Sequence, residues 1–210
     1  MNHPMTHRPA SFLGALMGLS AALGATAPVA GPMVTIAQPG RLPAIVTVAE
    51  PPDQVAYAVE DLQKYLGRIL GQDIQVSKGQ TPPQGFCLFV GEVPENADLR
   101  AAIAENKLGE QGFVLDVSAK GVRVLGASKF GTAYGVYELL ERLGVRWLFA
   151  GEWGEVVPEA KTLALPTDRV ADQPVFPIRV FASWSMGARS EVGHWCRRQR
   201  SFYDGFGGHS

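Results

Sequence analysis

The sequence predicts an α+β domain in which a mixed β-sheet packs with about three helices. Between positions 45 and 148, short apolar and β-branched runs alternate with helical patterns. Two of these runs, 112–118 and 122–125, flank a tight turn at Lys120 and Gly121, as in a hairpin. Hydrophobic residues make up 46% of the 210 residues and charged residues 19%, so the chain has enough apolar material for a folded core and is not of the disordered class.

The first thirty residues have the order of a secretory signal peptide. Arg8 gives a basic start, residues 12–23 form a short apolar run, and small residues follow at 25–30. The apolar run is short and rich in Gly and Ala, which disfavours a membrane-spanning helix; a non-cleaved anchor is the alternative. We therefore expect residues 1–30 to be removed and the mature protein to be secreted or periplasmic, with no stable membrane association.

In the first half of the mature chain, the sequence predicts two strands, then a helix, then two further strands. Four short runs that are β-branched or continuously apolar predict the strands: 34–37, 44–49, 73–77 and 86–90. The last of them is apolar throughout and is expected at the centre of the sheet. Asp53 is the expected N-cap of a helix that continues to Leu70, because apolar residues recur there at three- and four-residue steps. Gly71 is its expected C-terminal stop.

The second half predicts the hairpin, two further helices and short strands. A weaker helical pattern covers 96–107, before the hairpin. Ser128 can cap the next helix, which is expected to end at Leu143. Gly131 and Gly135 lie four residues apart in it, so one side of this helix can approach the sheet closely. Three short runs then predict strands: 145–149, 155–157 and 163–165.

The composition changes after residue 166, which suggests the boundary of the domain. Residues 166–174 are rich in turn formers and predict a linker. Residues 176–181 predict one strand, and a polar, arginine-rich tail follows without a closing element. A lone strand cannot bury its apolar side. We therefore expect one domain at 31–166, and at 167–210 a linker and the incomplete start of a second domain.

The segment 126–140 and its continuation 144–149 resemble a pattern typical of the N-terminal domain of α-glucuronidases. The same pattern is similar to the equivalent second domain of bacterial β-hexosaminidases. The expected helix at 55–70 carries further matching residues: Ala58, Asp61, Leu62, Tyr65 and Leu66. The resemblance covers about residues 34–165 and implies a hexosaminidase domain 2-like fold.

In these families a (β/α)8 barrel follows the domain, and its first strand opens with Pro-x-Phe-x-x-Arg. Residues 174–179 match that segment, and in β-hexosaminidases the matching arginine contacts sugar hydroxyls. The resemblance therefore implies a sugar contact for Arg179. Val180 stands where the hexosaminidases have Gly, which favours a less characterised group. The catalytic carboxylates of these families lie in the barrel, so the resemblance places none in this chain.

One acidic group could be read as catalytic. A glycosidase needs two carboxyl groups about 5 to 10 Å apart across the sugar. Glu152, Glu155 and Glu159 lie on a Gly- and Pro-broken loop beside Trp153. A sugar can stack on an exposed tryptophan, so Trp153 is a substrate-binding candidate. For the glutamates we expect instead a solvated loop packed on the neighbouring barrel, and hence no catalytic residue.

Other chemistries find little support. The net charge of −1 gives no electrostatic reason to bind nucleic acid. Residues 126–131 are not a phosphate loop, because Lys129 precedes the second glycine instead of following it. His194, Cys196 and His209 match no zinc spacing. The sequence predicts no metal, no cofactor and no nucleic-acid partner.

The C-terminal arginines and the cysteines carry two further expectations. Arg197, Arg198 and Arg200 are expected to be exposed here and to belong to the barrel. Cys87 and Cys196 are far apart in the chain and do not form a disulfide framework.

The resemblance implies a non-catalytic accessory domain of a secreted glycoside hydrolase that acts on polysaccharide or glycoconjugate. Its partner would be its own catalytic barrel, which it would cover and stabilise, and it would meet carbohydrate only through that barrel. The chain alone is then expected to be an inactive fragment of an α-glucuronidase- or β-hexosaminidase-like enzyme. Two alternatives remain: a stand-alone carbohydrate-binding module with Trp147 and Trp153 as stacking platforms, and a cell-envelope scaffold without sugar affinity.

Overall fold

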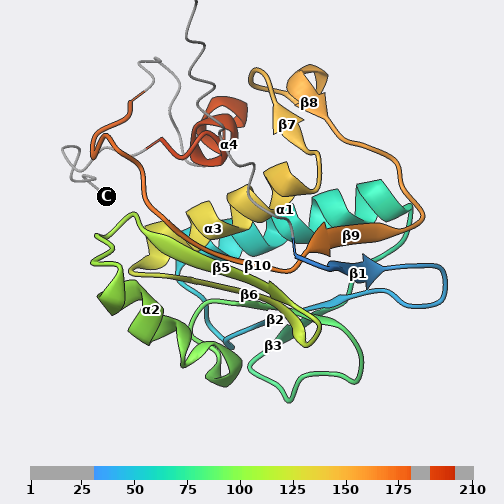
Figure 1. Cartoon of the computed structure of the whole chain (residues 1–210). Coiled ribbons are helices and arrows are strands. Elements are labelled where there is room, and N and C mark those ends of the chain that lie inside the picture. Colours follow the sequence, from blue (N-terminus) through green and yellow to red (C-terminus); the bar gives the residue numbers. More distant parts are fainter. Residues whose placement is uncertain (1–30, 181–189, 202–210) are drawn as a thin grey trace, which may run out of the picture.

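Six strands form one mixed sheet in the order β10–β5–β6–β4–β2–β3 (Figure 1). The computed structural model describes residues 31–180 and 190–201, so the expected signal peptide and residues 202–210 lie outside the described part. The strands of this sheet are β2 (Ala44–Thr47), β3 (Val76–Lys78), β4 (Cys87–Val90), β5 (Phe113–Ser118), β6 (Gly121–Gly126) and β10 (Asp168–Asp172). β3, β2, β4 and β6 are parallel, and β5 and β10 extend the sheet in antiparallel pairing.

Two long helices cover one face of the sheet and a short one lies on the other (Figure 1). The long helices are α1 (Asp53–Leu70) and α3 (Lys129–Arg142), and the short one is α2 (Leu99–Glu105), preceded by the 3₁₀ turn η1 (Pro94–Asn96). A fourth helix, α4 (Glu191–Arg198), lies on the side of α1 and α3 that faces away from the sheet. The predicted α+β class with a mixed sheet is thus confirmed, and α4 is an additional helix.

Two small antiparallel pairs complete the architecture. β1 (Met33–Ala37) pairs with β9 (Leu163–Pro166). β7 (Arg146–Trp147) pairs with β8 (Glu155–Val156), and the 3₁₀ turn η2 (Glu152–Gly154) lies between them. None of the helices in the described part of the chain is long and apolar enough to cross a membrane.

The main core fills the space between the sheet and the helices α1 and α3. Every second residue of a strand points into this core, as Ile45 of β2, Leu88 of β4 and Val124 of β6 do. They belong to the same buried cluster as Leu62 and other side chains of α1. The strand residues of opposite phase form a smaller cluster on the outer face together with Val93, which follows β4: Ala44, Val46, Cys87 and Phe89. β4 is buried at all four positions, as its unbroken apolar run predicts for an interior strand.

The helix ends test the predicted caps. Ser128 Oγ accepts a hydrogen bond from Phe130 N at 3.0 Å, so Ser128 caps α3 as expected. Gly71 adopts φ 65° and ends α1 in the left-handed conformation, as expected. The prediction that Asp53 is the N-cap was wrong: Pro52 occupies that position, and Asp53 is the first helical residue, where its charge favours the helix dipole.

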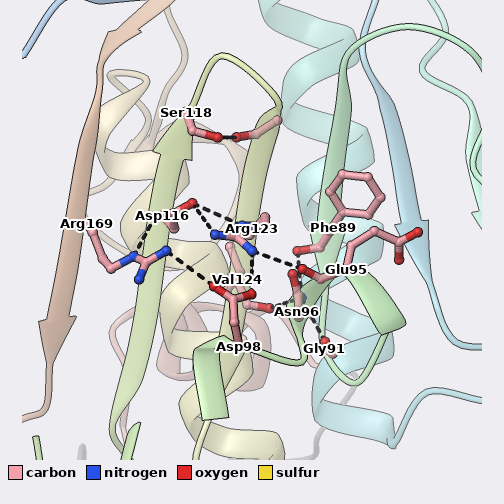
Figure 2. Close-up of polar contacts among 11 residues, drawn as sticks. Phe89, Gly91, Glu95, Asn96, Asp98, Asp116, Ser118, Arg123, Val124 and Arg169 are labelled. Atoms are coloured by element: carbon pink, nitrogen blue, oxygen red, sulfur yellow. Dashed lines mark hydrogen bonds and ion pairs between the residues drawn. The ribbon is translucent and has the colours of Figure 1, made fainter. Parts of the chain in front are cut away.

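On the outer face of the sheet, a network of charged side chains connects β10 to its neighbours β5 and β6 (Figure 2). Arg123 on β6 donates to Asp116 Oδ2 on β5 from Nε and Nη2, at 3.0 and 2.9 Å, and from Nη1 to Asp98 Oδ1 at 2.6 Å. Arg169 on β10 donates from Nε to Asp116 Oδ1 at 2.6 Å. Asn96 donates to the carbonyl oxygen of Val124 at 3.0 Å and so holds η1 against the same face.

This network explains where the predicted linker was wrong. Residues 168–172 pair with β5 along the whole strand, because Arg169 and Asp116 form a cross-strand ion pair and Val170 faces Leu115. The strand expected at 176–181 was also wrong as far as it is described, because 173–180 contribute to none of the three sheets.

Candidate functional site

Helix α4 is held against the rest of the domain by side chains that are buried beneath it. Ser190 caps the helix by accepting a hydrogen bond from Gly193 N at 3.0 Å. Cys196 and Arg198 lie on the buried side of α4. The expectation that Arg197, Arg198 and Arg200 are exposed was therefore wrong: only 7% of Arg198 is exposed, and the other two are partly buried.

Arg198 forms a forked contact with two carboxylates that come from different parts of the fold. Its Nε and Nη2 donate to Asp61 Oδ2 and Oδ1 of α1 at 3.0 and 2.8 Å, and Nη1 donates to Glu155 Oε1 of β8 at 3.1 Å. The three side chains are 9%, 9% and 3% exposed, in the order Arg198, Asp61, Glu155. The contact with Asp61 is bidentate, which is the geometry in which arginine binds a carboxylate most strongly, and Glu155 takes the remaining Nη1.

Glu155 has three further partners on α1. Tyr65 donates its hydroxyl at 2.5 Å, Lys64 Nζ lies 3.3 Å away, and Arg68 forms an ion pair with the other carboxylate oxygen. Burial acts to raise the pKa of Glu155, but the hydrogen bonds from Tyr65 and Arg68 and the charge of Lys64 outweigh it and lower that pKa. Glu155 therefore stays ionised at neutral pH and is unsuited to donate a proton as a general acid. The expectation of a solvated loop was wrong for this residue.

Aromatic rings surround the same cluster. Trp147 meets Tyr65 and Tyr137 edge to face, with ring centroids 5.5 and 5.8 Å apart. The guanidinium of Arg198 lies 5.3 Å from the ring centre of Tyr65, and Tyr137 donates its hydroxyl to Asp61 Oδ2 at 3.3 Å. Burial raises the pKa of both tyrosines far above the ordinary value, so both hydroxyls remain protonated donors.

The side chains of α4 and of the residue after it also contact the backbone of the β7–β8 hairpin. The carbonyl oxygen of Trp147 accepts hydrogen bonds from Trp195 Nε1 at 3.1 Å and from Gln199 Nε2 at 2.6 Å. Beyond the helix, Arg200 pairs with Glu138 and Glu141 of α3 at 2.9 and 2.6 Å. Ion pairs and hydrogen bonds thus attach α4 and the two residues after it to α1, to α3 and to the β7–β8 hairpin.

The predicted sugar contact Arg179 lies beside the end of this segment. Its Nε and Nη2 donate to the carbonyl oxygen of Arg200 at 3.1 and 2.5 Å, and Nη1 donates to that of Phe176 at 2.5 Å. Ser201 Oγ donates in return to the carbonyl oxygen of Arg179 at 2.7 Å, and the guanidinium lies 5.5 Å from the ring centre of Tyr134. These contacts tie residues 179 and 200 together, and a sugar contact by Arg179 stays a prediction.

The other predicted contact, Trp153, lies in η2 at the tip of the β7–β8 hairpin and is 95% exposed. Its neighbours Gly151 and Glu152 line a hollow of about 420 Å³, which is also lined by Glu155 and Arg198 but not by Trp153 itself. The hydrogen bonds of Arg179 to described residues go to 176, 200 and 201, so they do not bring the two candidates together. Within residues 31–180 and 190–201, no group of three His, Cys, Asp or Glu is placed to hold a metal ion. Both cysteines are free.

The sequence held a signal for the buried cluster that its helical pattern did not use. Asp61 is three residues after Ala58 and four before Tyr65, which are both fully buried, so it belongs to the apolar stripe of α1. A charged residue in such a stripe requires a partner of opposite charge. The partner, Arg198, lies 137 positions further along the chain, and no local pattern identifies it.

Acid should weaken the contribution of Glu155 to stability. Its pKa is lowered in the folded protein, so the stabilisation is complete above the ordinary glutamate value of about 4.3 and is lost as the pH falls through the lower folded value. We expect the difference in unfolding free energy between the wild type and Glu155→Gln to be constant above about pH 5 and to shrink as the pH falls below the ordinary glutamate value and through the lowered folded value. Urea titrations across this range measure it, and a difference independent of pH would show that Glu155 is not stabilised as an anion.

Comparison with known proteins places this geometry in context. A profile of the family described as the glycosyl hydrolase family 67 N-terminus matches residues 35–139. No curated protein matches the chain. Among solved structures, the chain is similar to a family GH115 4-O-methyl-α-glucuronidase with specificity for decorated arabinogalactans, at 19% identity, over 80% of this chain and 25% of that one, with a TM-score of 0.58.

Two further solved structures show a weaker likeness. One is the GH20 β-N-acetylhexosaminidase of Streptomyces coelicolor, at 17% identity, over 71% of this chain and 25% of that one, with a TM-score of 0.46. The other is an inactive mutant of the GH20 exo-β-N-acetylglucosaminidase of Vibrio harveyi, at 17% identity, over 71% and 18%, with a TM-score of 0.44. The chain spans a quarter or less of the length of these structures.

Proposed function

Because this chain belongs to the glycosyl hydrolase family 67 N-terminus family, we propose that it is the N-terminal accessory domain of a secreted glycoside hydrolase and stabilises a catalytic domain that follows it. The substrate of the whole enzyme would be a polysaccharide or glycoconjugate. The proposed export is supported by the order of basic, apolar and small residues in 1–30.

The proposal that this domain is not catalytic rests on the structural contacts of its buried carboxylates. Asp61 and Glu155 both line the hollow next to Glu152, and both form buried ion pairs with Arg198. A glycosidase needs one carboxyl group that holds a proton and another that can reach a sugar. Glu155 is held ionised and both acids are engaged by the fold, so this pair serves to dock α4 and not to cleave a glycosidic bond.

Deletion of the domain tests the proposal. In a longer protein that contains the catalytic domain, removal of residues 31–201 should lower the melting temperature of that domain and its hydrolysis of aryl glycosides, because its covered surface becomes exposed to water. The isolated chain should hydrolyse no aryl glycoside. Turnover by the isolated chain that is lost in Glu155→Gln would refute the accessory role, and an unchanged catalytic domain after the deletion would refute the stabilising role.

A stand-alone carbohydrate-binding module is the second candidate, and one observation favours it. Trp153 presents nearly its whole surface to solvent, and its neighbour Glu152 lines a hollow of about 420 Å³. An exposed indole can stack on the C–H face of a sugar ring. Glycan binding by the isolated chain, lost in Trp153→Ala, would support this candidate, and its absence across a glycan array would exclude it.

A further inference from the structure

A cavity of about 440 Å³ lies at the carboxyl ends of β2 and β3, on the outer face of the sheet. Its apolar walls include Val46 and Val93 of the outer-face cluster, and Val48, which packs against that cluster. The turn 79–82 after β3 and the segment 93–95 after β4 supply further walls. Small-molecule sites in proteins are clefts of about this size, mostly apolar and with a few polar groups.

The path of the chain explains why the sheet is hollowed at this place. β2 and β4 are neighbouring parallel strands. From β2 the chain continues into α1 on one face of the sheet, and from β4 it continues into η1 and α2 on the other face (Figure 1). Where the connections of two neighbouring parallel strands part in this way, a crevice forms outside their carboxyl ends, and ligands of open sheets bind in such crevices.

A single carboxylate borders this cavity, that of the half-buried Glu95. The carbonyl oxygen of Glu95 accepts a hydrogen bond from Arg123 Nη1 at 3.0 Å, but its carboxylate points away from Arg123 (Figure 2). Among the side chains that the structure describes, none forms an ion pair or a hydrogen bond with this carboxylate. A partly buried charge without such a partner favours the binding of an opposite charge.

The carboxylate of Glu95 also acts on a residue of the outer-face cluster. Burial raises the pKa of the Cys87 thiol, and the negative charge of Glu95 raises it further. Cys87 belongs to the same cluster as Val46 and Val93, which line the cavity. The carboxylate therefore lies within electrostatic reach of the apolar cluster beneath the cavity.

The composition of the walls selects the chemistry of a ligand. Of the residues that line the cavity, Glu95 is the only charged one and none is aromatic. The site therefore has no ring on which a sugar could stack, and its one carboxylate repels an anion. A compact aliphatic body that carries a positive charge is complementary to both features.

We propose that this cavity is a binding site for a small aliphatic amine, whose body packs against the valines and whose ammonium group pairs with Glu95. This inference goes beyond the proposed function and does not depend on it. The cavity lies on the other side of the sheet from α1, α3 and α4, and the site needs no following domain (Figure 1).

The test titrates the protein with cyclohexylamine, cyclohexanol and cyclohexanecarboxylate, which share one ring and differ in the attached group. At neutral pH the amine is protonated, because its pKa is close to the value of about 10.4 for lysine. We expect the amine to shift the backbone NMR signals of the residues that line the cavity. It should bind about tenfold more tightly than the alcohol, and the carboxylate should bind least.

Two variants assign this preference to Glu95. Glu95→Gln should weaken binding of the amine about tenfold and leave binding of the alcohol unchanged. Glu92→Gln is the matched control, because Glu92 lies three positions earlier, pairs with Arg100 and does not line the cavity. It should leave the affinity for the amine unchanged.

The outcomes separate the site from its selectivity. If none of the three compounds shifts the signals of the lining residues at about 10 mM, the cavity is not a binding site and the proposal is overturned. If the wild type binds all three equally, or if Glu95→Gln binds the amine as the wild type does, the assignment of an amine is wrong. Neither result bears on the accessory role, which the deletion of residues 31–201 tests separately.

Discussion

Replacing Arg198 with alanine is expected to lower the free energy of unfolding by about 3 kcal/mol. The substitution leaves Asp61 and Glu155 buried without the guanidinium that bridges them, at side-chain exposures of 9% and 3%. Removing one partner of a buried ion pair costs more than the pair itself contributes, because the remaining charge stays desolvated. The strain can be relieved when α4 leaves the surface and water enters. Urea unfolding measures the first effect, and protease cleavage within residues 190–201 measures the second.

Two variants make this result specific. Arg100→Ala removes a surface ion pair with Glu92, in which the side chains are 66% and 54% exposed, and should cost no more than about 1 kcal/mol. Arg198→Lys keeps the charge but lacks the planar fork that reaches both carboxylates, so it should be intermediate. If Arg198→Ala unfolds within about 0.5 kcal/mol of the wild type, the cluster does not hold α4 in place.

The elements that the sequence predicted well are those defined by local contacts. The helix over 53–70 follows from the spacing of its apolar residues, and its end follows from the conformation that Gly71 alone adopts easily. The hairpin β5–β6 follows from alternation about a turn. The family resemblance, drawn from residues 126–149, is confirmed by the family match and by the fold, because it too depends on a continuous stretch of chain.

The elements that were missed depend on contacts between distant segments. Residues 168–172 look like a linker because Asp168 and Asp172 are turn formers, yet they form β10 because Arg169 meets Asp116 across the strand pair. The tail looks polar and exposed because it contains several arginines, yet Arg198 is buried by carboxylates 43 and 137 positions earlier. Charge by itself predicts exposure, and only the partner shows that a charge is buried.

The residues of the candidate site also fall into those that the sequence pointed to and those that it did not. Trp153 was named because a tryptophan between glycines on a broken loop is conspicuous in the sequence. Its side chain is 95% exposed, and its contact with sugar stays a prediction. Arg179 was named from a family pattern, and its place beside Arg200 and Ser201 could not be read from local sequence. The cluster of Asp61, Glu155 and Arg198 was missed because its members come from three separate elements.

Gly131→Ala should destabilise the domain by about 3 kcal/mol, at the upper end of what one added methyl group usually costs. A Cβ atom there would lie 2.0 Å from the carbonyl oxygen of Gly112, which is backbone and cannot rotate away. That oxygen is fixed by Ala127 N, which donates to it at 2.9 Å, so it has no freedom to retreat. The whole helix α3 would have to move off the sheet, and the core that it shares with α1 would loosen with it.

Gly109→Ala provides the control for this substitution. Gly109 is exposed, adopts no positive φ, and a Cβ atom there would meet only the side-chain oxygen of Gln173 at an ordinary 3.5 Å. It should therefore unfold within about 0.5 kcal/mol of the wild type, since only the freedom of the unfolded chain changes. If chemical denaturation gave the two variants the same stability, the close approach of α3 to the chain before β5 would not be what fixes the helix against the sheet. A difference of several kcal/mol would show that the missing side chain at Gly131 is what lets α3 pack this closely against the chain before β5.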